Sequence, residues 1–205
     1  MQGKKMNKNI DRHSDGLHIR TIIPDDKDQF IHVQIEAGEI SESDKEGQEK
    51  DLYWQVILRS ENIINMIVFR EDDGLCIGTC SLHRFSGNYV ELGYNVLKAI
   101  RRHGFGTVIA RNLVGIAHEV FPDKDVMLRV RTDNFASQHI AEKCGGELVK
   151  YEPTPEAELC LEALEKYGHL EAGEQENIFF TAEQIRQYKE IVEKGKNGVV
   201  VYRIP

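Results

Sequence analysis

Two glycines stand where a loop is predicted to become a helix, a position that is suited to binding an anion. Gly104 and Gly106 fall within Arg101 to Thr107, which reads Arg-Arg-His-Gly-Phe-Gly-Thr. Glycine permits a tight turn and lets a ligand approach the backbone without meeting a Cβ atom. The first turn of a helix also directs unpaired N–H groups and the positive end of its dipole at the same point. The stretch therefore predicts a site for phosphate groups.

The segments on either side of this loop support that interpretation. Tyr89 to Val96 predicts a strand, and Val108 to Val120 carries apolar residues at the spacing of an amphipathic helix. Five basic side chains gather around the loop: Lys98, Arg101, Arg102, His103 and Arg111. A solvated surface would explain such a cluster equally well by itself, but its coincidence with the glycines favours an anion.

Two other phosphate-binding motifs do not fit this stretch. A P-loop requires Gly-Lys-Ser/Thr, and no such triplet follows the glycines. The dinucleotide-binding fingerprint requires a third glycine where the chain has Ile109. It also requires its first glycine at the end of the strand, whereas Gly104 lies well beyond Leu97.

The stretch also fits Q/R-x-x-G-x-G/A, the acetyl-CoA loop of the GNAT superfamily of N-acetyltransferases. Downstream, Val126 to Arg131 predicts a strand, Asn134 caps a second helix over 135–143, and Gly145-Gly146 ends that helix. This order of elements resembles the GNAT core over roughly residues 75–152. The resemblance implies a GNAT-like α+β fold, in which helices flank a mixed, mostly antiparallel central sheet.

The remaining segments fill in that domain. Short turns join three predicted strands into an antiparallel meander: Ile64 to Arg70, Leu75 to Phe85 and Tyr89 to Val96. Before them, Leu17 to Ile23 predicts a strand, and helices are expected from Pro24 and over Asp51 to Arg59. We expect residues 1–16 to form a disordered lead and residues 17–205 to form a single domain.

The last two predicted strands are separated by a long segment, whereas GNAT-like chains usually join them by a short turn. Thr154 to Tyr167 predicts an acidic helix, and a capping box from Thr181 to Gln184 starts another before the strand Val199 to Ile204. Residues 154–197 therefore predict a helical insertion. It is a tolerated surface insertion, a lid over the acceptor pocket or a homodimer contact.

The resemblance also implies where acetyl-CoA binds. Seven residues would form the pyrophosphate site: Arg101, Arg102, His103, Gly104, Phe105, Gly106 and Thr107. The strand from Tyr94 to Val96 would pair with the pantetheine arm and offer an N–H to the thioester carbonyl, with a bulge at Gly93 splaying the strand. Asn134 and Ser137 would make a second contact with that arm.

Glu91 is our candidate for the general base, because it is an acid within an otherwise apolar strand. Burial would raise its pKa toward the range useful for taking a proton from an ammonium group, directly or through water. A solvent-facing position on the outer side of the sheet fits the pattern equally well. His83, at the end of the preceding strand, is the second candidate.

The general acid is harder to assign. The family often has a tyrosine that protonates the departing thiolate, and alignment on Asn134 and Gly145 puts Ala141 at that position. Tyr94, Tyr89, water and the substrate are the alternatives that remain open.

Composition excludes several classes of protein. Formal charge is −8 (26 Lys and Arg against 34 Asp and Glu), which argues against nucleic-acid binding through phosphate neutralisation. No apolar run approaches the roughly 18 residues of a membrane span, and the N-terminus has no apolar signal-peptide core, so we expect a cytoplasmic protein. The four cysteines lack CxxC spacing, and we predict no metal site.

The leading hypothesis is an acetyl-CoA-dependent N-acetyltransferase that transfers an acetyl group to a primary amine by direct attack on the thioester. The alternative is a non-catalytic module that binds or senses acyl-CoA, which would explain Ala141 and the long insertion. Transfer of a longer acyl group would use the same phosphate site. The acceptor stays open among metabolite amines, antibiotic amines, polyamines, protein N-termini and lysines.

Overall fold

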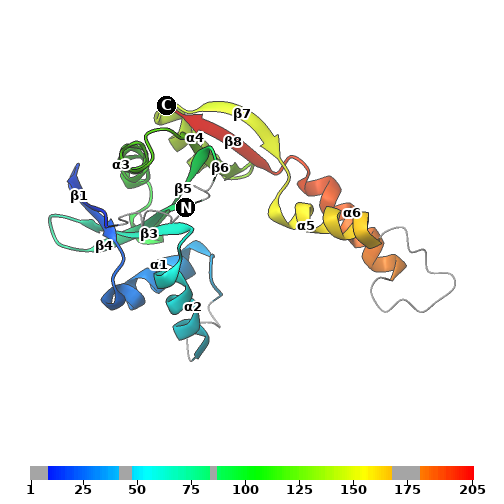
Figure 1. Cartoon of the computed structure of the whole chain (residues 1–205), viewed down its shortest axis with the longest axis horizontal. Coiled ribbons are helices and arrows are strands. Elements are labelled where there is room, and N and C mark those ends of the chain that lie inside the picture. Colours follow the sequence, from blue (N-terminus) through cyan, green and yellow to red (C-terminus); the bar gives the residue numbers. More distant parts are fainter. Residues whose placement is uncertain (1–8, 42–47, 84–86, 168–180) are drawn as a thin grey trace, which may run out of the picture.

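The computed structural model describes residues 9–41, 48–83, 87–167 and 181–205. Its strands form one sheet of eight, in the order β1-β2-β3-β4-β5-β6-β8-β7, and every neighbouring pair is antiparallel except β5 with β6 (Figure 1). The strands are β1 Asp11–Ser14, β2 Leu17–Thr21, β3 Ile63–Arg70, β4 Cys76–His83, β5 Tyr89–Val96, β6 Asp125–Arg131, β7 Glu147–Glu152 and β8 Val199–Ile204. The predicted mixed, mostly antiparallel sheet is confirmed.

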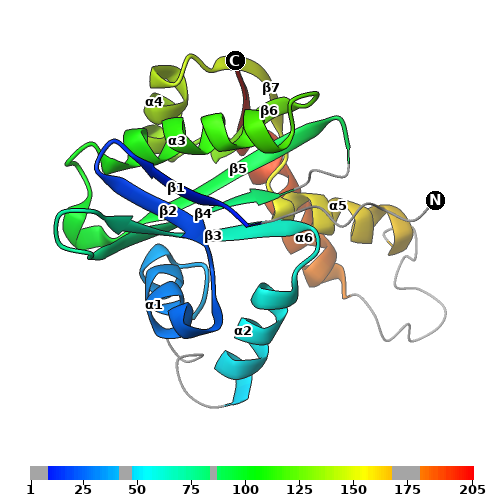
Figure 2. The same ribbon diagram turned by 60° about the vertical axis from the view of Figure 1, so that its left-hand side comes forward.

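Helices cover both faces of this sheet, with α1 and α2 on one side and α3 and α4 on the other (Figure 2). The helices are η1 Pro24–Asp26, α1 Lys27–Ala37, α2 Gln48–Arg59, η3 Lys98–Ile100, α3 Phe105–Val120, α4 Phe135–Lys143, α5 Pro155–Tyr167 and α6 Ala182–Gly195. Among the described residues, none of these helices combines the length and the apolar character that crossing a membrane requires.

Successive side chains of a strand point to opposite faces of the sheet, so the apolar residues form two cores of unequal size, one on each face. On the α3 side, Val90 and Leu92 of β5 join a large cluster with Ile109 and Leu113 of α3. On the α1 side, the smaller cluster centres on Phe30 and Trp54, whose rings lie 5.6 Å apart. Much of the sheet face beneath α1 and α2 therefore carries polar side chains.

The N-terminal lead is shorter than the sequence pattern predicts. Residues 11–14 form β1, an edge strand paired with β2, and only residues 1–8 lie outside the described part of this segment. Asp15 and Gly16 make the tight turn, with φ values of 55° and 74°. Arg12 then reaches from β1 to α3, where it donates to the carbonyl of Asn112 at 3.2 Å and pairs with Glu119.

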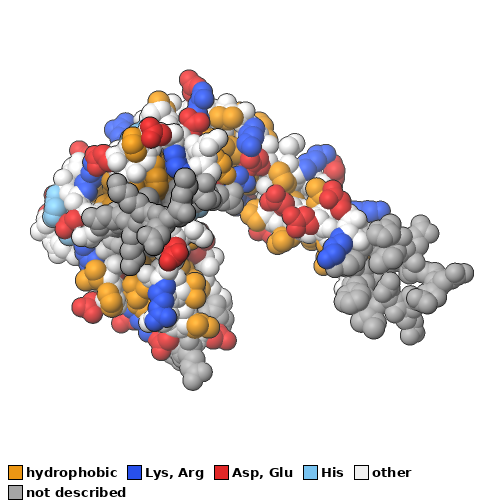
Figure 3. All heavy atoms as spheres, viewed as in Figure 1, with side chains coloured by type: hydrophobic (Ala, Val, Ile, Leu, Met, Phe, Trp, Pro, Cys, Tyr) orange, Lys and Arg blue, Asp and Glu red, His pale blue; other side chains and the backbone are white. Residues whose placement is uncertain are grey.

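The predicted helical insertion is confirmed as an arm made of α5 and α6, which pack against each other and leave the body at the ends of β7 and β8 (Figure 1). Thr154 donates from its amide to the carbonyl of Gly195 at 2.9 Å and closes the base of the arm. Charges of both signs and exposed leucines share the arm's surface (Figure 3). Residues 168–180, which join the two helices, lie outside the described residues.

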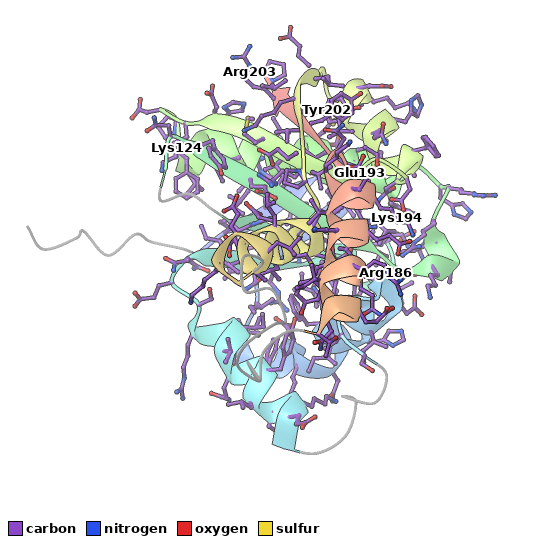
Figure 4. The ribbon with its side chains drawn as sticks, turned by 90° about the vertical axis from the view of Figure 1, so that its right-hand side faces the viewer. Lys124, Arg186, Glu193, Lys194, Tyr202 and Arg203 are labelled. Carbon is purple, nitrogen blue, oxygen red and sulfur yellow. The ribbon has the colours of Figure 1, made fainter. Side chains whose placement is uncertain are left out.

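The charged side chains of α6 largely pair within the helix itself. Arg186 pairs with Glu183, and Lys194 pairs with Glu190 at 2.6 Å, each one turn apart along the helix that faces the viewer in Figure 4. The capping box predicted at Thr181 and Gln184 is present at its start. This arm therefore satisfies many of its own polar groups internally, and Glu156 of α5 also lies 3.9 Å from Arg131 of β6.

Candidate functional site

The sheet opens between β5 and β6. These parallel strands pair from Tyr89 opposite Asp125 to Glu91 opposite Met127, and their pairing ends there. The pairing of β4 with β5 continues without a shift as far as Val96, so the predicted bulge at Gly93 is not part of that ladder. The opening arises because β6 diverges from β5. The edge of β5 that β6 leaves unpaired offers backbone groups to an extended ligand.

The phosphate site predicted at residues 101–107 follows β5 and the short helix η3. Gly104 is the N-cap of α3 with φ 87°, and no atom lies within 4 Å of the place where its Cβ would be. Within the described chain, the amides of Gly104, Phe105 and Gly106 have no hydrogen-bond acceptor. The amides of Thr107 and Val108 both donate to the carbonyl of Gly104. Three free N–H groups thus point out of the first turn of a 16-residue helix.

The two glycines have different roles in this turn. Gly106 packs against α4, because a Cβ there would lie 2.9 Å from Cδ1 of Ile140. Gly104 instead leaves the approach to the loop open, and Arg102 before it adopts an uncommon φ of 68°. Gly104 therefore leaves the backbone open to close approach, while Gly106 lets the two helices meet.

The basic side chains of the loop are exposed, but two of them contact backbone carbonyl groups of neighbouring residues. Arg101 donates from Nε to the carbonyl of Val96 at 3.0 Å, and Nδ1 of His103 lies 3.2 Å from the carbonyl of Ile100. These contacts fold the loop back onto the end of β5. A role for Arg101 and Arg102 in binding phosphate stays a prediction.

A cavity of about 470 Å³ lies at the opening in the sheet and brings the other predicted residues together. Six of its lining residues are Glu91, His83, Tyr94, Asn134, Ser137 and Arg129. Residues 101–107 and Val96 are not part of its lining, and neither is any described residue of α5 or α6. The cavity, as the predicted reaction end of the site, is therefore separate from the free amides of α3, the predicted anchoring end.

Glu91 is buried, with 7% of its surface exposed, and points to the α1 side of the sheet. The solvent-facing alternative for this residue is wrong. Its Oε1 lies 3.9 Å from Nε2 of His83, its cross-strand partner, and its Oε2 lies 3.9 Å from Nε of Arg129. Burial penalises the ionised form of the carboxylate, whereas the guanidinium stabilises it.

Arg129 was missed by the sequence reasoning. It follows Met127 by two positions, so it shares a sheet face with Glu91, and it also pairs with Glu152. The sequence does carry a signal for a polar residue at this place, because valine and leucine alternate with arginine along β6. The alternation of residues along β6 indicates a buried polar face, but it does not identify the carboxylate that Arg129 contacts.

Tyr94 points to the opposite, α3 and α4 side of β5. Its hydroxyl is buried and has no partner in hydrogen-bonding geometry among the described residues, although Ser137 lies close to it. Burial raises the pKa of Tyr94 to about 12, while Ser137 acts to lower it. A buried O–H without an acceptor is costly, so this group is poised to donate to a ligand in the opening.

The start of α4 completes this side. Asn134 caps the helix, its Oδ1 accepting from the amide of Ser137 at 3.1 Å, and both residues line the cavity. Ala141, at the position where the family often has tyrosine, is fully buried in the main core. The hydroxyl that faces the opening therefore comes from β5, through Tyr94.

A chain of neutral polar groups forms the α1 side of the cavity. Gln34 of α1 donates from Nε2 to Oγ1 of Thr79 at 3.1 Å, and Asn95 donates from Nδ2 to Oε1 of Gln34 at 3.4 Å. Glu39 and Tyr53 also line this side. Sequence reasoning missed these residues because their convergence depends on how α1 crosses β4 and β5.

Residues present in this structure fit acetyl-CoA. The fit rests on the three acceptor-free amides at α3, the unpaired edge of β5 and the orphaned hydroxyl of Tyr94. These groups suit, respectively, the pyrophosphate anion, the extended amide chain and the thiol leaving group of acetyl-CoA.

Comparison with known proteins agrees with this geometry. Residues 17–147, well over half of the chain, match the family model of the acetyltransferase (GNAT) domain. None of the curated proteins compared with the chain matches its sequence.

Solved structures show the same fold at low sequence identity. One is a spermidine N-acetyltransferase from Vibrio cholerae in complex with CoA and spermine (14% identity, TM-score 0.57, covering 68% of this chain and 86% of that one). Another is a protein from Vibrio cholerae assigned provisionally as a ribosomal-protein-serine acetyltransferase (17% identity, TM-score 0.60, covering 98% and 100%). The match to the domain over most of its length shows that this chain belongs to the GNAT acetyltransferase family.

Proposed function

We propose that this protein transfers an acetyl group from acetyl-CoA to the primary amine of a small cationic acceptor by direct attack on the thioester. The observation that carries the proposal is the pair of buried groups at the opening between β5 and β6. Glu91 lies on one face of β5 and the Tyr94 hydroxyl on the other. A proton acceptor and a proton donor thus meet where the sheet is open.

The chain supplies an anchoring point for each part of the cosubstrate. The free amides of Gly104, Phe105 and Gly106 would hold its pyrophosphate, and the edge of β5 beyond Glu91 would pair with its pantetheine arm. Asn134 and Ser137 line the opposite wall of the opening. When bound, acetyl-CoA supplies the activated acetyl thioester.

Glu91 would accept the proton that the amine must lose before it attacks. Its carboxylate lines the cavity beneath α1 and α2, so the acceptor enters from that side. His83, 3.9 Å from Oε1, would orient the carboxylate or pass the proton to solvent. Glu39 and Glu91 both line the cavity and favour a cationic acceptor, as do the protein's net charge and the spermine bound by one structural neighbour.

Tyr94 would give a proton to the sulfur as the C–S bond breaks. Because burial raises its pKa to about 12, the phenol stays protonated at neutral pH and acts only as a donor. The N–C bond forms as the C–S bond breaks, and Glu91 holds the proton that the ammonium group loses before attack. The nitrogen loses a second proton after it attacks, and this proton replaces the one that Tyr94 gives to sulfur. Tyr94 therefore takes the place of the tyrosine that Ala141 replaces.

A second candidate function is an acyl-CoA-binding module without turnover, and the buried Ala141 is the observation that favours it. The two are separated by measuring free-thiol release from acetyl-CoA with a panel of amines that includes spermidine, spermine and amino-terminal peptides. Calorimetry with CoA runs in parallel. We expect acetylation of at least one small polycationic amine.

The two measurements decide between the candidates. Binding of CoA without acetylation of any amine would support the module, and absence of CoA binding would overturn both. A series of longer acyl-CoA thioesters tests acetyl preference. A cytoplasmic location and a homodimer contact through the arm stay predictions.

A further inference from the structure

We propose that the β1–β2 hairpin binds a divalent transition-metal ion such as Zn²⁺ between Asp11, His13 and His18. This is the single cluster of its kind in the part of the chain that the structure describes. It lies outside the cavity at the opening in the sheet. The prediction of no metal site rested on the cysteines, and none of these three residues is a cysteine.

The hairpin brings the three side chains to one face. His13 and His18 are directly opposite each other in the β1–β2 ladder, and Asp11 precedes His13 by two positions on the same strand. Each offers one ligand atom, and these atoms all lie within 4.8 Å of one another. The Asp11 carboxylate is 2.7 Å from Nε2 of His18 and 3.8 Å from Nε2 of His13.

A fourth residue supplies the outer support that metal-binding histidines usually have. Nδ1 of His13 lies 2.6 Å from Oε1 of Glu71, on the far side of the ring from Asp11. A histidine that ligates a metal typically donates its other ring N–H to a carboxylate, which sets the tautomer and the ring orientation. Glu71 also donates from its amide to the carbonyl of Gly16 at 3.0 Å, so it is held against the same turn.

His18 is oriented by packing. It is the least exposed member of the cluster, with its ring 4.0 Å from that of His13 and 6.1 Å from that of Phe69. Two imidazoles stacked in parallel between two carboxylates present both Nε2 atoms to the same oxygen. Only Nε2 of His18 is close enough to hydrogen-bond this oxygen, whereas a metal ion would use both nitrogens.

The donor set selects the class of metal. Two imidazole nitrogens and one carboxylate oxygen suit Zn²⁺, Cu²⁺, Ni²⁺ or Fe²⁺, while Ca²⁺ and Mg²⁺ prefer oxygen ligands. Zn–N distances of roughly 2.0–2.1 Å place tetrahedral donors roughly 3.4 Å apart. The 3.8 Å between Asp11 and His13 must therefore shorten and the 2.7 Å between Asp11 and His18 must lengthen, each by less than about an ångström. Asp11 and His13 are well exposed and can move that far by small side-chain rotations.

Such an ion would join three segments that meet at this corner of the sheet. Asp11 and His13 belong to β1 and His18 to β2, and Glu71 lies in the turn between β3 and β4. A ligand that binds the folded chain alone stabilises it by mass action. The site would therefore fasten the edge strand without taking part in acyl transfer.

The experiment is calorimetric titration of the metal-stripped full-length protein with Zn²⁺, followed by thermal unfolding with and without the ion. We expect binding of one Zn²⁺ per chain and a rise in Tm. Asp11→Asn and His13→Ala should each abolish stoichiometric binding. Glu71→Gln should weaken binding by about 10- to 100-fold, the effect expected for an outer carboxylate.

His32→Ala is the matched control. His32 is similarly exposed and lies 3.5 Å from Glu36, but it belongs to no such cluster among the described residues, so this variant should bind Zn²⁺ like wild type. Asp11 and His13 are exposed, which keeps their variants folded, and circular dichroism verifies this. Absence of stoichiometric binding, or binding that survives both Asp11→Asn and His13→Ala, would show that the cluster is only a hydrogen-bonded network.

Discussion

The two faces of β5 bury different chemistry, although their residues alternate along one strand. Val90 and Leu92 lie in the main core beneath α3, and Tyr94 continues that face to the opening. Glu91 and Asn95 face α1 and line the polar side of the cavity. The comparison teaches that the sheet itself separates Glu91 from Tyr94, the two groups proposed to transfer protons. Both reach the same opening because β6 leaves β5 immediately after Glu91.

The largest loss of activity should come from a substitution on the face of β5 that points to α1. Glu91→Gln keeps the size of the side chain but removes its ability to take a proton, so kcat should fall by about 10²- to 10⁴-fold. The KM for acetyl-CoA should change little, because Glu91 lies on the acceptor side. Steady-state kinetics at saturating acceptor measure both values. Glu158→Gln, on the exposed surface of α5, is the control. Unchanged turnover in the Glu91 variant would remove it as the base.

On the other face, Tyr94→Phe should reduce activity and increase stability together. Loss of the proton donor should lower kcat by about 10- to 100-fold, since water can partly replace it. Removal of a buried hydroxyl without a hydrogen-bond partner should raise the free energy of unfolding by about 1 kcal/mol. Denaturant unfolding of both proteins measures this change. A less stable variant would show that the hydroxyl is satisfied in the folded protein.

The pH dependence of stability sharpens the same prediction. In the folded protein burial raises the pKa of Tyr94 to about 12, from 10.0 in the unfolded chain. Between these pH values the folded state holds a proton that the unfolded state has lost, so stability falls as pH rises through the interval. This contribution is fully present below pH 10. Tyr94→Phe should flatten the decline, and parallel slopes for the two proteins would contradict the assignment.

Substitutions at the predicted anchoring end, in the loop before α3, should change activity less than those at Glu91 and Tyr94. Gly104→Ala forces a side chain into a left-handed conformation and should cost about 1 kcal/mol of stability. It should also raise the KM for acetyl-CoA several-fold. Gly106→Ala meets only the flexible tip of Ile140 and is the matched control, with a smaller effect on KM. Equal effects of the two substitutions on KM would indicate that both glycines face the ligand.

The smallest effect is expected from the arm. Replacing residues 155–196 with a short turn should leave kcat and the acceptor KM nearly unchanged, because no described residue of α5 or α6 lines the cavity. Kinetics and size-exclusion chromatography of the shortened chain measure this. A large loss of activity would favour the lid, and loss of a dimer would favour the homodimer contact.

Local patterns in the sequence predicted much of the arrangement. The glycine loop, α4 with its asparagine cap and the capping box of α6 lie where these patterns place them. Each depends on residues within one turn of one another. The absence of the family's tyrosine at Ala141 was visible for the same reason.

Contacts between distant segments could not be read in this way. Whether Glu91 faces solvent or cavity depends on which helices cover its side of the sheet, and Arg129 reaches it only across a parallel pair of strands. Likewise β1 is a short polar strand whose pairing depends on a two-residue turn and on Arg12 contacting α3. Polar segments of this kind carry no hydrophobic period, so they resemble an unstructured lead.

The link from Arg12 to α3 affects how the protein should be produced. Shortening the chain past residue 12 would remove the guanidinium that contacts Asn112 and Glu119, in the middle and last turns of the helix whose first turn offers the free amides. A purification tag is therefore better attached before residue 9 through a flexible spacer. A clone trimmed to the start of β2 would be expected to show weaker CoA retention on an affinity column.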